Sequence, residues 1–232
     1  MLYSQSYGQG PDLVLLHGWG FNGDIFQGLV EQYQHQYRVT LIDLPGHGRS
    51  KPVAGGLPEW SDAVMAVLPN NPILLGWSLG GLLAIHIASQ MAIQKLILVA
   101  STPKFVQDPH WPYGIDSNNF KQFADELNQN PAKGIKRFIG LQTRDRGQLK
   151  TLNQAIDRHP IDLQTLNQGL GILLETDLTQ PFQALKIDKQ IILGDKDTLV
   201  PDAIHHWYQQ QGAQSSVLNS GHMPFLQADF DL

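Results

Sequence analysis

The chain has 232 residues, of which 42% are hydrophobic and 16% charged, and it contains no cysteine. This length and composition indicate one globular α/β domain, or a core domain with an insertion; they exclude a disordered chain, a disulfide framework, a thiolate metal site and a cysteine nucleophile. The formal net charge of −5 argues against non-specific binding to nucleic acid.

Short apolar runs alternate with helical stretches along most of the chain. A continuous apolar run is typical of a strand that is buried on both faces, and the alternation predicts βαβ units around a mostly parallel sheet. The expected strands are 13–16, 37–43, 73–75, 95–100, 190–193 and 216–218, after a short opening strand within 2–7, and the expected helices include 26–33, 60–68 and one directly after residue 78.

A loop of small residues, His17-Gly-Trp-Gly20, follows the strand at 13–16. Such a loop places backbone N–H groups at the carboxyl edge of the sheet, where open α/β sheets bind ligands. The amide of Trp19 is therefore the natural first oxyanion donor, and that of Leu79 the second. We expect His17 to brace this loop by hydrogen bonding.

The segment around Ser78 has the pattern of a nucleophile elbow. A buried strand leads into Gly76-Trp-Ser-Leu-Gly80, and an apolar helix follows. A serine on a sharp strand-to-helix turn needs neighbours almost without side chains, which Gly76 and Gly80 provide. The turn directs the Ser78 hydroxyl out of the sheet edge, with the N-terminus of the helix behind it.

The alternation of strands and helices breaks between about 103 and 181, where apolar residues recur with helical spacing instead. We expect a helical lid over the carboxyl edge of the sheet. The predicted division is a hydrolytic core of residues 1–105 and 183–232 and a helical cap of residues 106–182.

A serine nucleophile requires a base, and the base requires an orienting carboxylate. In the order Ser, Asp, His, both partners follow Ser78 at the ends of later strands. His222 lies in the loop after the strand at 216–218, and Asp195 and Asp197 compete in the loop after 190–193. We favour Asp197, because Asp195 comes straight off the strand whereas the turn presents Asp197.

No metal and no cofactor are expected. His205 and His206 are a candidate metal pair, but adjacent side chains on a helix point about 100° apart and chelate poorly. No apolar run approaches the ~20 residues of a membrane helix. Residues 1–8 lack the basic and apolar regions of a secretory signal, so we expect a cytoplasmic protein that does not enter the membrane.

These motifs, together with Asp43-Leu-Pro-Gly-His-Gly-Arg-Ser50 and Gly194-Asp-Lys-Asp-Thr-Leu-Val-Pro201, resemble the α/β-hydrolase superfamily over nearly the whole chain. More narrowly, the chain resembles the pimeloyl-[acyl-carrier protein] methyl ester esterases of biotin synthesis. The narrower resemblance depends on His-Gly-Trp-Gly, on Gly-Trp-Ser-Leu-Gly-Gly, and on two segments of the lid, 137–143 and 169–181. After His222 ten residues remain, where the family carries a longer closing helix.

The resemblance implies an α/β-hydrolase fold and a triad of Ser78, Asp197 and His222, with Trp19 and Leu79 as the oxyanion amides. It also implies that the substrate contacts Trp19, Ser78, Leu79 and His222, together with the lid stretch Phe138, Ile139, Gly140, Leu141 and Gln142. The implied partner is an acyl carrier protein that bears a pimeloyl methyl ester, and the implied docking residues are Lys133, Arg137 and Lys150. A monomer without a cofactor is expected.

The charges of the lid agree with such a partner. Residues 133–158 carry seven basic and two acidic side chains, a net charge of +5, while the rest of the chain carries −10. A run of this kind is often only a solvated helix face. Over an esterase site, however, it suits an acidic carrier protein with a phosphodiester, because lysine and arginine steer encounter and hold phosphate.

The sequence therefore predicts a serine carboxylesterase that hydrolyses the methyl ester of a carrier-bound pimeloyl chain. Its nearest rival is a broad-specificity esterase for short free esters, or another hydrolase of this fold that acts on lactones or carbon–carbon bonds. A catalytically inactive binding protein of the same fold is the alternative from another class.

Overall fold

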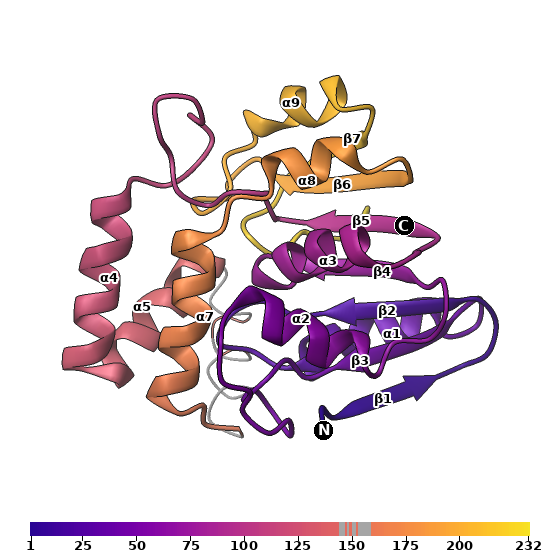
Figure 1. Ribbon diagram of the computed structural model, residues 1–232, viewed down its shortest axis with the longest axis horizontal. Helices are drawn as coiled ribbons and strands as arrows, with labels where there is room; N and C mark the ends of the chain where they lie inside the picture. Colours follow the sequence, from indigo (N-terminus) through magenta and orange to yellow (C-terminus); the bar gives the residue numbers. More distant parts are fainter. Residues whose placement is uncertain (144–146, 148, 150–151, 153–158) are drawn as a thin grey trace.

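The computed structural model describes residues 1–143, 147, 149, 152 and 159–232. Within these residues, seven strands form one sheet in the order β1-β3-β2-β4-β5-β6-β7 (Figure 1). β1 is antiparallel to β3, and the other neighbours are parallel. The strands are β1 Ser4–Tyr7, β2 Asp12–Leu16, β3 Arg38–Ile42, β4 Ile73–Trp77, β5 Lys95–Val99, β6 Asp188–Gly194 and β7 Gln214–Leu218.

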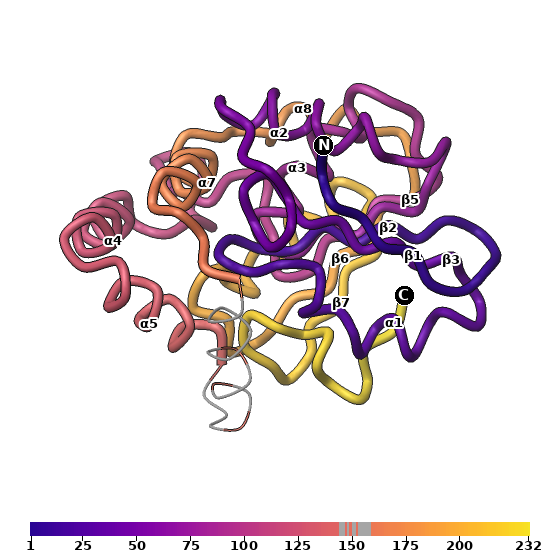
Figure 2. Tube along the Cα trace, turned by 90° about the horizontal axis from the view of Figure 1, so that it is seen from below, coloured from indigo at the N-terminus to yellow at the C-terminus, as the bar shows by residue number. Residues whose placement is uncertain are grey.

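The core lies at the central strands, because their side chains are covered on both faces. Val14, Leu74 and Leu98 are fully buried. On one face lie α2, α3 and α8, and on the other lies α1 (Figure 2), while α9 packs on β6 and β7. The bounds are η1 Gly23–Phe26, α1 Gln27–Tyr33, α2 Leu57–Met65, α3 Leu79–Gln90, α8 Thr179–Ala184 and α9 Ile204–Gln210.

Three helices lie beyond the carboxyl ends of the parallel strands, at the left of Figure 1. They are α4 Ser117–Gln129, α5 Pro131–Gln142 and α7 Leu163–Glu175. α4 packs on α5 and on α7, and α7 also contacts α3. Between β5 and α4 the described chain makes two isolated bridges, Val106 with Ile115 and Asp108 with Trp111. These helices occupy the segment for which the sequence predicts a lid; its bounds as a cap stay a prediction.

The predicted fold class is confirmed, and the differences lie at the ends of elements. The helix expected from residue 60 begins at Leu57, because Pro58 suits a first helical turn and the Glu59 carboxylate accepts the Gly56 amide at 2.8 Å. β7 begins at Gln214, two residues before the predicted start, because this strand is at the sheet edge and exposes polar side chains.

The residues after His222 pack against the core. The short helix η2, Pro224–Leu226, places the ring of Phe225 5.2 Å from those of Phe26 and Trp77. The hydroxyl of Tyr33 on α1 donates to Asp231. No described helix combines the length and apolar character needed to cross a bilayer.

Candidate active site

Ser78 lies on the sharp turn between β4 and α3, with φ 54° and ψ −118°. A backbone in this region costs about 1–3 kcal/mol for a residue with a side chain and persists only where its surroundings impose it. Here the surroundings are tight: a Cβ on Gly76 would lie 2.4 Å from the carbonyl oxygen of Gly80, and one on Gly80 would lie 2.3 Å from that of Leu16. The structure thus has the strained elbow that the glycines predict.

The structure pairs His222 with Asp197. Nδ1 of His222 is 2.7 Å from Oδ2 of Asp197, and both side chains are fully buried. The other oxygen, Oδ1, accepts the amides of Leu199 and Val200 at 2.8 and 3.1 Å, which fixes the carboxylate. Asp195 instead accepts the amide of Ser220 at 3.0 Å. The geometry therefore favours Asp197 as the orienting carboxylate.

The second ring nitrogen of His222, Nε2, is buried and has no hydrogen-bond partner among the described residues. The loop that carries it is tied to the elbow, because the indole N–H of Trp77 donates to the carbonyl oxygen of His222 at 2.7 Å. Trp77 directly precedes Ser78. An imidazole with a carboxylate on Nδ1 and a free Nε2 can act as a general base, and catalytic hydrogen bonds often shorten only when substrate binds.

Two backbone amides beside Ser78 are free to hold an oxyanion. Leu79 is the first residue of α3, so its N–H has no acceptor within the helix. The loop of Trp19 lies against the nucleophile, since a Cβ on Gly18 would be 3.3 Å from Cβ of Ser78. Among the described residues, neither amide donates to a backbone or side-chain acceptor.

A cavity of about 280 Å³ lies under the lid; Trp19 borders it, whereas Ser78, Leu79, Asp197 and His222 do not. Its walls are mainly apolar, and its border includes Trp19 and Thr198, which follows Asp197. Phe138 and Leu141 of α5 face it, as the sequence predicts. These two residues are three apart on a helix and so share one face. Ile139 does not border the cavity and is buried in the core, and its contact with substrate stays a prediction.

Gly140 and Gln142, the other predicted members of this stretch, border a second hollow of about 430 Å³, which shares Leu141 and Thr198 with the first. The main chain of Gln142 still serves the site, because its carbonyl oxygen accepts the amide of His222 at 3.1 Å. In the described part of the chain, no group of three or more His, Asp and Glu side chains is placed to hold a metal ion.

A family model described as the alpha/beta hydrolase family matches residues 13–230. The chain belongs to the α/β-hydrolase family. A curated protein of Vibrio campbellii named pimeloyl-[acyl-carrier protein] methyl ester esterase is 40% identical over 97% of this chain and 92% of its own length. A protein of the same name from Pseudoalteromonas atlantica is 36% identical over 97% of this chain and 92% of its own length. An esterase structure from Exiguobacterium antarcticum superposes with a TM-score of 0.88 at 24% identity, covering 97% of this chain and 90% of that one.

Two buried histidines hold the oxyanion loop of this hydrolase. His17 accepts the amide of Leu44 on Nε2 at 2.9 Å and places Nδ1 2.8 Å from the carbonyl oxygen of Gly18. His47, in the loop after β3, makes the equivalent contacts in the opposite direction. Its Nε2 accepts the amide of Gly20 at 3.3 Å, and its Nδ1 lies 2.9 Å from the carbonyl oxygen of Pro45. Each imidazole thus bridges the loops after β2 and β3, and the predicted bracing role of His17 is confirmed.

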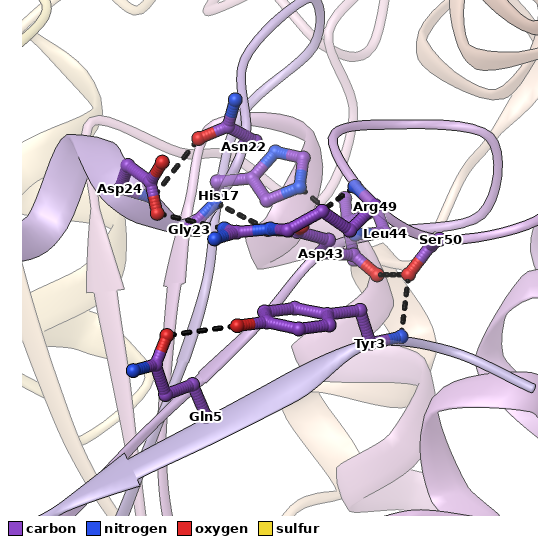
Figure 3. A network of polar contacts seen from close by, with 10 residues as sticks. All are labelled: Tyr3, Gln5, His17, Asn22, Gly23, Asp24, Asp43, Leu44, Arg49 and Ser50. Atoms are coloured by element: carbon purple, nitrogen blue, oxygen red, sulfur yellow. Dashed lines mark hydrogen bonds and ion pairs between the residues drawn. The ribbon is translucent and has the colours of Figure 1, made fainter. Parts of the chain in front are cut away.

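An ion pair between the buried Asp43 and the partly exposed Arg49 supports the same two loops (Figure 3). Asp43 accepts the amide of Gly23 and both the amide and Nε of Arg49, all within 2.9 Å. The guanidinium of Arg49 also donates to Asp24 and lies 4.1 Å from the Tyr3 ring centre. Burial alone would raise the pKa of Asp43, but the bonds from Arg49 hold it below its ordinary value.

The two bridging histidines make folding of this hydrolase sensitive to acid. Burial lowers the pKa of His17 to about 4 and that of His47 to about 3, from 6.5. Below pH ~6.5 the unfolded chain therefore binds protons that the folded chain rejects. The free energy of unfolding should fall by about 1.4 kcal/mol per pH unit for each histidine between pH ~6.5 and ~4.

Urea unfolding of the wild type and of His47→Gln at pH 7, 6 and 5 measures this dependence. The variant has lost one of the two histidines that take up a proton on unfolding. The slope of its free energy of unfolding against pH should therefore be smaller than that of the wild type by about 1.4 kcal/mol per pH unit. Equal slopes in the two proteins would show that His47 does not titrate with this shift.

Two of the three predicted docking cations lie on α5 and are already paired. Nζ of Lys133 is 2.7 Å from Oε1 of Glu126, and Nη1 of Arg137 is 2.8 Å from Oε2 of the same carboxylate on α4. Lys133 and Arg137 are 70% and 47% exposed, so both remain accessible. Lys150 lies outside the described residues. The sequence analysis did not predict that Glu126 pairs with both cations. The available signal was an acidic residue shortly before the basic run.

Sequence reasoning also assigned no role to His47 or Arg49. Both lie in the Gly/Pro-rich loop that directly follows β3, and a polar side chain at the end of a parallel strand is a general signal of a group at the site edge. Each has one partner some 25 residues away in the chain: Gly20 for His47 and Asp24 for Arg49. Only the packing of the two loops reveals which atoms they contact.

Proposed function

We propose that this hydrolase is a serine carboxylesterase that removes the methyl group from the pimeloyl methyl ester of an acyl carrier protein. The observation that carries the proposal is the His222–Asp197 pair, with a free Nε2, beside a strained Ser78. Support for the substrate comes from the curated relatives, which bear the name pimeloyl-[acyl-carrier protein] methyl ester esterase and align over 97% of the chain.

In the first half of the proposed reaction, His222 takes the hydroxyl proton on Nε2 as Ser78 Oγ attacks the ester carbonyl carbon. Asp197 holds the imidazole by Nδ1 and stabilises the imidazolium. The carbonyl oxygen becomes an oxyanion that accepts the Trp19 and Leu79 amides, each worth about 3 kcal/mol of transition-state stabilisation. The tetrahedral intermediate collapses, the ester C–O bond breaks, and His222 protonates the departing methanol.

In the second half, water enters and His222 removes one of its protons. The hydroxide attacks the acyl-enzyme carbonyl, and the same two amides hold the second oxyanion. The bond from carbon to Ser78 Oγ breaks, and His222 returns the proton to the serine. The products are methanol and a carrier-bound chain that ends in a free carboxylate.

The apolar cavity under α4, α5 and α7 would hold the methylene chain. Its border includes the aromatic rings of Phe120, Phe123 and Phe138, which suit a hydrocarbon and offer no partner to a charged terminus.

The proposed partner is an acidic acyl carrier protein, approached from the lid side. Lys133 and Arg137 would contact it from α5, and Arg137 also borders the cavity, so a phosphodiester near this guanidinium lies at the cavity mouth. Lys150 stays a predicted contact. We further propose that residues 106–182 act as the cap and that the esterase acts as a monomer in the cytoplasm.

Neutralising the docking cations should separate large from small substrates. We expect Lys133→Gln/Arg137→Gln to lower kcat/KM for carrier-bound ester by about 3- to 30-fold, because rim charges act mainly on association. Hydrolysis of p-nitrophenyl acetate should be unchanged. Glu126→Gln is the matched control, since it removes the counter-charge and keeps both cations, and it should not slow the carrier-bound reaction. Equal losses on both substrates would reject the docking role.

The substrate itself is tested by comparing carrier-bound pimeloyl methyl ester with the free dimethyl and monomethyl esters of the same diacid. The proposal predicts a kcat/KM at least about tenfold higher for the carrier-bound ester. Equal or faster turnover of short free esters or lactones would indicate a hydrolase of broad specificity. No turnover of any substrate, with no labelling of Ser78 by a fluorophosphonate, would indicate a binding protein.

A further inference from the structure

The side chain of Trp19 is fastened to the lid. Its indole N–H donates to the carbonyl oxygen of Leu166 on α7 at 2.8 Å, and the residue is only 1% exposed. The same residue carries, in its main chain, one of the two amides assigned to the oxyanion. The lid therefore contacts, through the Trp19 side chain, the residue whose main-chain amide is the assigned oxyanion donor.

Gly169 of α7 forms the wall against which the indole lies. A Cβ at this position would be 2.8 Å from Cδ1 and 3.3 Å from Nε1 of Trp19, and 3.4 Å from Cδ2 of Leu79. The helix thus lies against the side chains of both residues whose amides are assigned to the oxyanion. On its other side the indole meets the ring of Phe138, with centroids 4.6 Å apart, and that of Phe123 at 5.7 Å. The ring is therefore in contact with α7, α5 and α4, and it also borders the cavity.

α7 is itself fixed to the core. Asp162 caps its N-terminus by accepting the amide and hydroxyl of Thr165 at 2.8 and 2.9 Å. Thr165 is buried against the loop after β3, where a Cβ on Gly46 would lie 2.3 Å from its hydroxyl oxygen. That loop also supplies His47, which accepts the amide of Gly20 next to Trp19. Side chain and main chain of Trp19 are therefore held by one connected assembly.

We propose that α7 is a positioning element of the oxyanion hole: the Leu166 carbonyl and the bare backbone at Gly169 set the orientation of Trp19, and through it the direction of the Trp19 amide. Leu166 and Gly169 act through Trp19 and do not contact the reacting atoms. The inference rests on the proposed function, because it takes the Trp19 amide as an oxyanion donor. It predicts that catalysis is sensitive to a single methyl group on the lid helix.

Gly169→Ala tests this, with Gly171→Ala as the matched control. Both glycines lie inside α7, where alanine favours the helix by about 1 kcal/mol. A Cβ on Gly171 would meet nothing within 4 Å, whereas one on Gly169 meets the indole. On p-nitrophenyl acetate, Gly169→Ala should lower kcat about 10- to 100-fold with little change in KM, since loss of one oxyanion donor costs 10²–10³ in kcat. Gly171→Ala should match the wild type.

A trifluoromethyl ketone supplies the second readout, because its tetrahedral adduct with serine needs the oxyanion hole. Its affinity should fall in Gly169→Ala by the same factor as kcat, while denaturant midpoints remain similar in the two variants. Should Gly169→Ala fail to fold, Trp19→Phe is the second variant: it keeps an aromatic ring but is smaller than the indole and lacks the N–H that donates to Leu166. It should lower kcat and ketone affinity by the same factor, and by more than it changes KM.

The outcomes separate this inference from the proposed function. Wild-type kcat and ketone affinity in Gly169→Ala, or a loss confined to KM, would overturn the positioning role and leave the esterase intact. A wild-type protein that hydrolyses p-nitrophenyl acetate but not carrier-bound ester would reject the substrate and leave the inference standing. A wild-type protein with no hydrolase activity would overturn both.

Discussion

Replacing Ser78 by alanine is expected to lower kcat/KM for every ester by at least about 10⁴-fold, because no other group can form the acyl-enzyme. Stability should change little. Alanine fills the same buried site, and the positive φ at this position is imposed by the strand, the helix and the glycines around it. Steady-state hydrolysis and urea unfolding of the same preparations measure both effects.

Ser89→Ala is the matched control for this substitution. Ser89 lies near the end of the same helix, α3, and is exposed, with its hydroxyl donating to the carbonyl oxygen of His86 at 2.6 Å. The control should keep full activity. An Ser78→Ala variant that retained more than about one per cent of wild-type kcat/KM would show that the nucleophile is elsewhere.

Asp197→Asn is expected to reduce kcat by about 10⁴-fold. The carboxylate accepts from Nδ1 of His222 at 2.7 Å and so keeps Nε2 as the proton acceptor that Ser78 requires. An asparagine presents a neutral oxygen or an N–H at this place. It therefore neither stabilises the imidazolium nor enforces the tautomer. The two amides that bond to Oδ1 can keep an asparagine side chain in place, so the fold should persist.

The control for Asp197 lies two residues earlier. Asp195 accepts the amide of Ser220 through Oδ1, and the side-chain oxygen of an asparagine makes the same bond. Asp195→Asn should therefore retain activity within a few-fold of the wild type. Comparable losses in Asp195→Asn and Asp197→Asn would mean that the loop as a whole, and not the carboxylate on His222, is required.

The fold could be predicted from the sequence wherever a strand is buried on both faces. Leu13, Leu74 and Leu96 belong to continuous apolar runs, and each strand was expected within two or three residues of its observed bounds. The edge strand β7 and the first turn of α2 were placed less well. β7 consists largely of polar residues, and the start of α2 is set by capping contacts. Hydrophobic periodicity detects neither feature.

The candidate site was predictable to the extent that its groups follow directly from strands. Ser78 and His222 each come at or just after a strand end, and the parallel topology brings these ends to one edge. The choice between Asp195 and Asp197 depended on a turn, and the hydrogen bond from His222 to Asp197 supports the second. The pairing of Lys133 with Glu126 and the bond from Trp19 to α7 join segments that nothing in the local pattern connects.

A crystal structure of the protein after reaction with a small fluorophosphonate tests the account most directly. The adduct should be on Oγ of Ser78, with the phosphoryl oxygen about 2.7–3.1 Å from the amide nitrogens of both Trp19 and Leu79 and with Nε2 of His222 beside Oγ. An adduct on another residue, or a phosphoryl oxygen that faces neither amide, would contradict it.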